Sequence, residues 1–236
     1  MTHLHEHAAD LFGLSLTPEQ QAAFSFYERE LLAWNTHTNL TTITDPEAIT
    51  VRHFLDSLSV SPVLPRTEGI RLIDVGAGAG FPGLPLTIVF PRIQVTLLEA
   101  TGKKTRFLNH IITTLNLPNA TTLNARAEEA GQMPDQRAQY AVAVARAVAR
   151  LPALLEYLLP LVQIGGQAIA MKGETAPEEI ADARRALDIL GGQVKSVEAV
   201  KLPGLEDIHH LIVIEKIAPT PPQYPRRPGV PTRKPL

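Results

Sequence analysis

The chain of 236 residues contains no cysteine, which excludes disulfide bonds and thiolate zinc sites. It has no apolar run near the roughly 18 residues that a membrane span requires. Residues 1–14 also lack the basic and then apolar layout of a signal peptide. With 44% hydrophobic and 19% charged residues, the composition is that of a globular protein. We therefore expect a cytoplasmic protein with one sizeable α/β domain and an appendage.

The chain also lacks a large net charge, since its 22 basic and 24 acidic residues give a formal net charge of −2. The average conceals an asymmetry, because residues 219–236 carry four basic residues and no acid. Subtracting that +4 from −2 leaves −6 for the rest of the chain. A surface that binds nucleic acid would therefore have to be local.

The most informative stretch is RLIDVGAGAGFPG at residues 71–83. An apolar run leads through Asp74 into Gly76, Gly78 and Gly80, which is typical of a buried strand that ends in a tight turn. Because glycine has no Cβ, such a turn lets a ligand approach the backbone closely. The alternative is a glycine-rich turn that merely packs closely against its neighbours.

The glycine spacing separates two kinds of nucleotide site. A dinucleotide fingerprint reads G-x-G-x-x-G, and in that frame Phe81 occupies the place of the third glycine. The form present here, D-x-G-x-G-x-G, instead resembles motif I of class I S-adenosylmethionine methyltransferases. A nicotinamide-dependent oxidoreductase remains the alternative at this point.

An acidic residue follows the next predicted strand. Residues 93–98 have a strand pattern that ends at Glu99, where a nucleotide-binding βαβ unit places the carboxylate that accepts the ribose hydroxyls. Taken alone, Glu99 could equally cap a helix or face solvent. Next to the glycine turn, the ligand interpretation is favoured.

Strand and helix patterns alternate along the rest of the chain, which predicts a mostly parallel sheet with helices on both faces. The last two strand patterns, 194–201 and 210–216, predict a closing antiparallel pair. Before the glycine turn, Thr17, Pro18 and Gln20 predict a capped helix start. The expected further strands are 121–124, 140–145 and 167–171, and the expected helices include 84–90, 151–161 and 178–190.

The apolar stripe of the first predicted helix must be covered by the main domain, and a second helix is expected from Pro46. The stripe residues are Ala23, Phe26, Tyr27, Leu31 and Trp34. Before this helix, the alternating histidines at positions 3, 5 and 7 could bind a metal, but we expect a frayed terminus and no metal site.

Positive charge begins the helix predicted after residue 102. Lys103, Lys104 and Arg106 lie at the end where the helix dipole disfavours cations. They are either solvated or they face a phosphate. The same two alternatives apply to the basic residues of the proline-rich tail at residues 219–236.

Short motifs along nearly the whole chain together resemble the RsmG (GidB) family of bacterial small-subunit ribosomal RNA guanine-N7 methyltransferases. They are NLT at 39–41, HxxDSL at 53–58, DVGAGAGFPGLPL at 74–86, GKKTRFL at 102–108, RAEE at 126–129, ARA at 145–147, MKG at 171–173 and YPRRPGVP at 224–231. The resemblance implies methylation of guanine N7 in the 530 loop of 16S ribosomal RNA, with S-adenosylmethionine as cofactor. Guanine N7 carries no proton, so no general base is expected and positioning should dominate.

The residue patterns above and this resemblance together predict roles for individual residues. Cofactor-binding positions are Gly76, Gly78, Gly80, Phe81, Glu99, Ala127, Glu128 and Arg146, and Arg146 is the one expected positioning residue in catalysis. Expected RNA-binding positions are Asn39, His53, Lys103, Lys104, Arg106, Lys172, Arg226 and Arg227. The partner that the resemblance implies is 16S ribosomal RNA or the small subunit, and a monomer is expected.

Three segments follow from this interpretation: an N-terminal helical extension (1–65), a methyltransferase core (66–218) and a proline-rich basic tail (219–236). A non-catalytic RNA-binding accessory protein is the remaining alternative. It would keep the basic tail but could lose the cofactor pocket.

Overall fold

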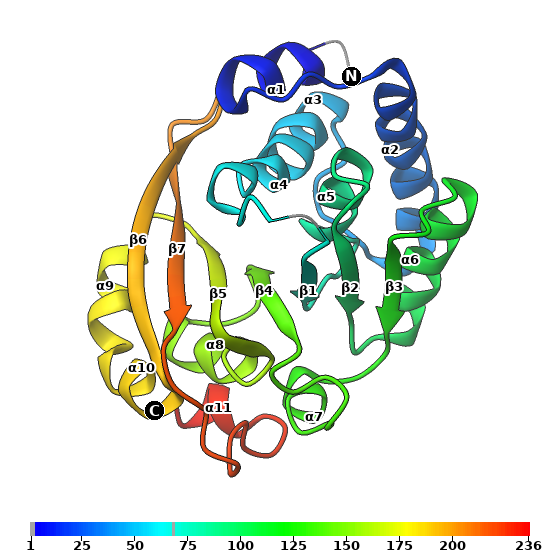
Figure 1. Ribbon diagram of the computed structural model, residues 1–236. Helices are drawn as coiled ribbons and strands as arrows, with labels where there is room; N and C mark the ends of the chain where they lie inside the picture. Colours follow the sequence, from blue (N-terminus) through cyan, green and yellow to red (C-terminus); the bar gives the residue numbers. More distant parts are fainter. Residues whose placement is uncertain (1–2, 68) are drawn as a thin grey trace.

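The computed structural model describes residues 3–67 and 69–236. A seven-stranded sheet runs through it in the order β3-β2-β1-β4-β5-β7-β6 (Figure 1). In chain order the strands are β1 (Arg71–Val75), β2 (Gln94–Leu98), β3 (Ala120–Leu123), β4 (Tyr140–Arg146), β5 (Val162–Lys172), β6 (Gly192–Lys201) and β7 (Ile208–Lys216). Strands β1 to β5 pair in parallel, whereas β7 pairs antiparallel with β5 and β6. The predicted sheet and its closing antiparallel pair are confirmed.

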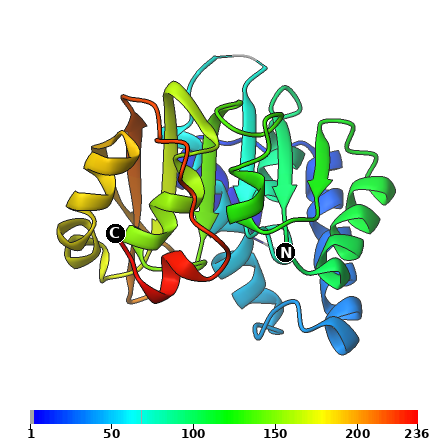
Figure 2. The same cartoon turned by 90° about the horizontal axis from the view of Figure 1, so that it is seen from below.

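Helices cover both faces of the sheet (Figures 1 and 2). The helices are α1 (Leu4–Phe12), α2 (Pro18–Thr38), α3 (Pro46–Ile49), the π-helix η1 (Thr50–Leu55), α4 (Asp56–Leu58), the 3-10 helix η2 (Ser61–Val63), α5 (Gly83–Val89), α6 (Gly102–Thr114), α7 (Ala127–Ala130), α8 (Leu151–Leu158), α9 (Ala176–Asp182), α10 (Arg184–Leu190) and α11 (Val230–Arg233). None of the helices in the described ranges is long and apolar enough to cross a membrane.

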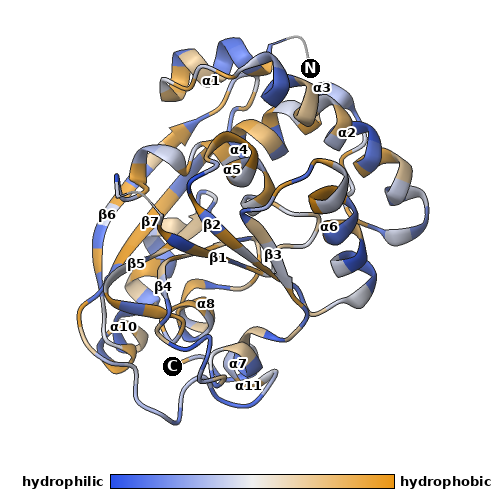
Figure 3. Ribbon diagram, turned by 45° about the vertical axis from the view of Figure 1, so that its right-hand side comes forward, coloured by the Kyte–Doolittle hydropathy of each residue, from blue (hydrophilic) through white to orange (hydrophobic). Residues whose placement is uncertain are grey.

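Alternate strand residues belong to two separate hydrophobic clusters. Leu72 faces a cluster that includes the N-terminal helices, α5 and α6, whereas its neighbour Ile73 faces a cluster built around α8 and α10. This is the period of two that a strand covered on both faces requires. Figure 3 shows the result as largely hydrophobic central strands beside helices, such as α2 and α6, that carry hydrophilic segments.

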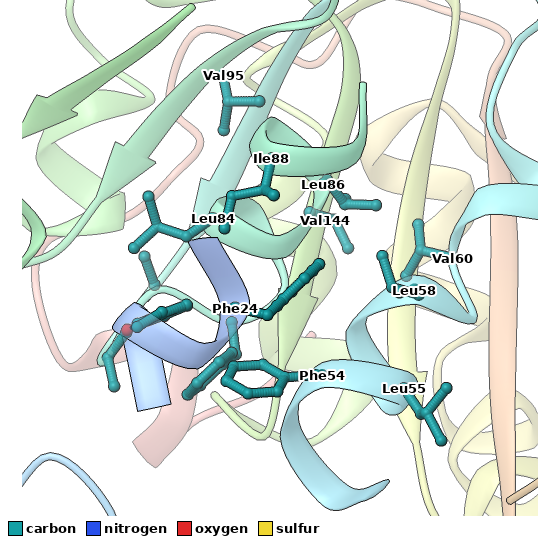
Figure 4. Close-up of a cluster of buried hydrophobic side chains, with 14 of the residues drawn as sticks. Phe24, Phe54, Leu55, Leu58, Val60, Leu84, Leu86, Ile88, Val95 and Val144 are labelled. Carbon is teal, nitrogen blue, oxygen red and sulfur yellow. The ribbon is translucent and has the colours of Figure 1, made fainter. Parts of the chain in front are cut away.

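The N-terminal helices join the first of these clusters. Thr17 and Gln20 form the predicted capping box at the start of α2. The buried side chains of α2 are Phe24, Tyr27 and Leu31, so the predicted stripe is partly wrong, because Phe24 and not Phe26 is fully buried. Phe24 packs on Phe54 with the ring centroids 5.1 Å apart (Figure 4).

Two other predictions about elements are wrong. The expected frayed terminus is helix α1, which Leu4 and Ala8 hold in place by burying their side chains. The helix expected at 178–190 is divided at Ala183 into α9 and α10. Each outcome depends on packing partners that lie far away in the sequence.

Candidate functional site

The glycine turn after β1 serves both packing and ligand access. Gly78 and Gly80 have positive φ values of 60° and 102°. A Cβ on Gly80 would lie 2.4 Å from Leu84 Cδ1, whereas a Cβ on Gly78 would meet nothing closer than 3.8 Å. Close packing therefore explains Gly80, while Gly78 leaves its backbone open to an approaching group.

Glu99 ties β2 to this turn. Its Oε2 accepts a 2.9 Å hydrogen bond from the Gly78 amide, and its Oε1 accepts one of 2.7 Å from the Thr101 amide. The side chain is 7% exposed. Because each carboxylate oxygen can accept more than one hydrogen bond, Glu99 can orient the turn and still accept from a ribose.

A cavity of about 250 Å³ opens above the carboxyl ends of β1, β2 and β3. Ligands of open α/β sheets bind at this edge. The cavity is lined by Gly76, Glu99, Ala127, Glu128, Val148, Tyr157, Gly229 and Thr232, among others. Four of the predicted cofactor-binding residues thus meet in one place, and the C-terminal Gly229 and Thr232 join them without having been predicted.

Asp74, the acidic residue of the glycine motif, binds the end of the turn that leads into α5. Its Oδ2 accepts a 2.8 Å hydrogen bond from the amide of Gly83, which begins α5. The other carboxylate oxygen is buried and has no hydrogen-bond partner among the described residues. Burial raises the pKa of Asp74 to about 7, so the carboxyl can carry a proton at neutral pH.

Phe81, His53 and Arg146 form a stack beside the glycine turn. The His53 ring lies parallel to Phe81, with centroids 4.5 Å apart and planes 16° apart. The Arg146 guanidinium lies 5.0 Å from the centroid of the Phe81 ring. Burial and the nearby charge of Arg146 lower the pKa of His53 to about 4, which keeps this imidazole neutral.

Arg146 is also bound to Asp56, which the sequence did not identify as a site residue. Its Nη1 donates to Asp56 Oδ2 at 2.8 Å and to the Arg52 carbonyl at 2.9 Å. The other oxygen, Asp56 Oδ1, lies 2.8 Å from His209 Nδ1. Burial opposes ionisation of Asp56, but hydrogen bonds from His209 and Arg146 outweigh it and lower the pKa of this carboxyl.

The π-helix η1 supplies the first part of this arrangement. It carries both Arg52 and His53, and π-helical turns frequently occur at functional sites. Thr41, in the segment between α2 and α3, fixes His53 through a 2.8 Å contact between Oγ1 and Nε2. The NLT and HxxDSL motifs therefore cooperate, although no local pattern indicated the π-helical geometry.

A second cavity, of about 390 Å³, lies at the ends of β4 and β5 and the start of β7. It is lined by Ile43, Arg52, His53, Asp56, Arg146, Ala147, Met171, Lys172, Gly173, His209, His210 and Leu211. Ala147 lines this cavity and the next residue, Val148, lines the first, so the two cavities lie next to each other just after the end of β4. Within the described part of the chain, no group of three His, Cys, Asp or Glu side chains could hold a metal ion.

The residues predicted to bind RNA fall into two groups. Lys103 and Arg106 are exposed at the start of α6, Lys104 is half-buried beside them, and Asn39 and Arg227 are exposed. No hydrogen bond or ion pair engages the three basic side chains of α6 within the described ranges. They remain available to an external anion.

Three of the predicted RNA contacts already have protein partners. Lys172 forms a 2.7 Å ion pair with Glu179 in which both side chains are 8% exposed. Arg226 pairs with Glu156 at 2.7 Å, and His53 is buried. These contacts make Lys172 and Arg226 poor candidates for phosphate ligands, because RNA would first have to displace a buried carboxylate.

Comparison with known proteins shows the family of this chain. The family model described as rRNA small subunit methyltransferase G matches residues 20–211. The chain belongs to this family. The ribosomal RNA small subunit methyltransferase G of Roseiflexus castenholzii is 50% identical over 97% of each chain. That of Acetivibrio thermocellus is 47% identical over 95% of this chain and 92% of the relative.

Similarity to solved structures supports the fold. The structure of M. jannaschii TYW2 in complex with AdoMet aligns with a TM-score of 0.51 and 16% identity. The alignment covers 64% of this chain and 71% of that chain. The Rossmann-like methyltransferase fold is thus shown, and S-adenosylmethionine is the cofactor that the family uses.

Proposed function

We propose that this protein transfers a methyl group from S-adenosylmethionine to N7 of a guanine in small-subunit ribosomal RNA, in the 530 loop of that RNA. The observation that carries the proposal is the cavity at the ends of β1–β3. Its lining residue Glu99 binds the open backbone of Gly78, and the chain is a member of a ribosomal RNA methyltransferase family. We further propose that it acts as a cytoplasmic monomer.

The residues of the first cavity fit this cofactor. Glu99 can accept the ribose hydroxyl protons, while the backbone around Gly78 can approach the part of the cofactor nearest the sulfur without obstruction from a side chain. Ala127 and Glu128 line the side beyond the ribose, where the adenine belongs. When bound, the cofactor supplies an electrophilic methyl group on a positively charged sulfur.

The second cavity suits the acceptor base. It lies next to the first, since Ala147 lines the one and Val148 lines the other, and the stacked His53 and Arg146 form part of its wall. A base bound there would lie beside the cofactor site. Guanine N7 offers a lone pair in the plane of the ring and needs no proton removed. The task of the protein is therefore alignment and accommodation of the charge that moves to the base.

The charges around the second cavity serve that task. His53 stays neutral because burial and the nearby charge of Arg146 lower its pKa to about 4. The Asp56 carboxylate balances the guanidinium of Arg146 at 2.8 Å. Arg146 is consequently a positioning residue that joins the stack to the N-terminal helices, and no side chain is needed as a general base.

We assign RNA binding to the exposed cations near this edge of the sheet. Helix α6 begins shortly after Glu99, so Lys103, Lys104 and Arg106 lie on the same edge as the cofactor cavity. Asn39 caps α2 next to the segment that fixes His53. Arg227 adds an exposed charge from the tail.

Two experiments test the proposal. Calorimetry should show binding of S-adenosylmethionine and no binding of NAD, since binding of NAD would favour an oxidoreductase. Incubation with RNA should then produce 7-methylguanine, detected by borohydride reduction and aniline cleavage of the chain and mapped by primer extension. Naked 16S RNA and intact small subunits are compared as substrates. Cofactor binding without methylation of either substrate would favour an accessory protein.

A further inference from the structure

The C-terminal segment, residues 219–236, is docked on its own domain (Figure 2). The guanidinium of Arg137 donates to the carbonyls of Thr220 at 2.9 Å and Tyr224 at 2.7 Å. Gln132 donates to the carbonyl of Pro225 at 2.9 Å, and the Pro225 side chain is buried. In these contacts, side chains of the domain hold the backbone of the C-terminal segment.

A buried ion pair is the strongest of the anchors. Glu156 on α8 is fully buried, and its Oε2 accepts from Arg226 Nη2 at 2.7 Å while its Oε1 accepts from the Arg226 amide at 2.6 Å. A carboxylate removed from water in this way requires a partner. Arg226 is that partner, so its charge serves to hold the segment in place.

Beyond this anchor the chain enters the wall of the first cavity. The Gly229 amide donates a 2.8 Å hydrogen bond to Glu128 Oε1. Gly229 and Thr232 both line the cavity with Glu99 and Ala127. Tyr157 on α8 lines the same cavity. The family match ends at residue 211, so this wall lies outside the matched part.

We propose that residues 229–232 form part of the cofactor site and bind its adenosyl end. Thr232 contacts the adenosine, and the Gly229 amide orients Glu128 beside it. This inference rests on the proposed function, because it takes the ligand of the cavity to be S-adenosylmethionine. It assigns the C-terminal segment to cofactor binding, where the sequence predicted RNA binding alone.

The test uses the full chain and a chain that ends at Pro228, which keeps the Arg226–Glu156 pair. Affinities are measured by calorimetry without RNA, for S-adenosylhomocysteine and for 5′-methylthioadenosine, which lacks the amino-acid part. Loss of the contacts from Gly229 and Thr232 should weaken both ligands by the same factor, about tenfold or more. A second variant, Thr232→Trp, changes an exposed residue and should obstruct the cavity with the fold intact.

The control is Lys234→Ala, which removes a charge of the segment and keeps its cavity-lining residues and the 3.1 Å hydrogen bond from Arg233 Nε to the Gly229 carbonyl. Its affinity for both ligands should equal that of the full chain. Wild-type affinity in the chain ending at Pro228, or tighter binding, would overturn the inference. Loss for S-adenosylhomocysteine alone would also overturn it, by placing the segment at the amino-acid end. Failure of the unaltered protein to bind either ligand would instead count against the proposed function.

Discussion

The guanidinium of Arg146 at the end of β4 donates a 2.8 Å hydrogen bond to the carboxylate of Asp56, 90 residues earlier in the chain. The Asp56 side chain is 6% exposed and that of Arg146 is 18% exposed. The pair connects the N-terminal helices to the edge of the sheet where both cavities open. The helical extension is therefore part of the site's architecture as well as of the hydrophobic core.

A double-mutant cycle tests this connection. Asp56→Ala should lower the free energy of unfolding by about 3 kcal/mol, because it leaves the largely buried charge of Arg146 without its carboxylate. Arg146→Met should cost less, because Asp56 keeps His209 as a partner. The double variant should lose less than the sum of the two, with a coupling energy of about 1 kcal/mol or more. Urea unfolding measures the free energy of unfolding of all three variants. Additivity within about 0.5 kcal/mol would show that the pair contributes nothing of its own.

The second prediction concerns Glu99. Glu99→Ala removes the acceptor of the Gly78 and Thr101 amides as well as the proposed ribose acceptor. We expect cofactor binding to weaken by about 1.5 to 3 kcal/mol, the usual worth of a hydrogen bond to a charged group. Glu99→Gln, which keeps one acceptor oxygen, should lose less. Calorimetry measures the affinity of both variants for S-adenosylmethionine. Unchanged affinity in Glu99→Ala would show that this residue does not bind the cofactor.

The third prediction separates backbone strain from ligand contact at Gly78. Gly78→Val should abolish cofactor binding, because a branched side chain would occupy the open space in front of the turn. Gly204 is a matched control. It has a similar φ of 69° and no atom within 4 Å of an added Cβ. Gly204→Val should carry the same strain, roughly 1 to 2 kcal/mol, and bind the cofactor normally. Equal affinities in the two variants would contradict the assignment.

The sequence predicted what depends on local pattern. The sequence predicted the alternating strands and helices, the capping box of Thr17 and Gln20, and the glycine turn. Each of these is set by neighbours within a few residues. The closing antiparallel pair was predicted as well. These elements determine the fold and the place of the proposed cofactor cavity.

What escaped prediction depends on contacts between distant segments. Nothing near Arg226 indicates that its partner is Glu156, a buried acid 70 residues earlier. Likewise, His209 on β7 meets Asp56 on α4 only after the sheet has formed. The basic residues of the proline-rich tail suggested an RNA-binding segment, whereas the tail has a fixed course over α7 and α8. Residues of one site therefore came from segments that pattern alone could not connect.

The fourth prediction follows from Asp74. Burial raises its pKa from 3.8 to about 7, so between these values the folded protein holds a proton that the unfolded chain releases. Stability should therefore fall as the pH rises from about 4 to about 7, by at most about 1.4 kcal/mol per pH unit, and then level off.

Asp74→Asn should abolish this part of the pH dependence, which is measured by urea unfolding at several pH values. The exposed Asp188 provides the control, since Asp188→Asn should keep the slope of the unaltered protein. A slope that persists unchanged in Asp74→Asn would show that the carboxyl is ionised throughout this range.

The last prediction concerns the RNA surface. Lys103, Lys104 and Arg106 begin α6 against its dipole, where stability alone would not place them, at the same edge of the sheet as the proposed cofactor cavity. Each phosphate contact adds roughly 0.7 to 0.9 to the slope of log affinity against log salt concentration. Replacing Lys103 and Lys104 by Ala should therefore weaken RNA binding and flatten the slope by up to about 1.5 to 2, with cofactor affinity unchanged.

The chain offers a matched control for this charge change. Arg184 and Arg185 are exposed at the start of α10, on the opposite face of the sheet, so Arg184→Ala/Arg185→Ala removes the same charge from another helix start. Filter binding to small-subunit RNA at several salt concentrations gives all the slopes. If the α6 variant keeps the slope and methylation rate of the unaltered protein, its cations are only solvated surface. If the α10 variant flattens the slope equally, net charge and not position governs RNA binding. Flattening in the α6 variant alone would place the RNA across the edge of the sheet where α6 begins.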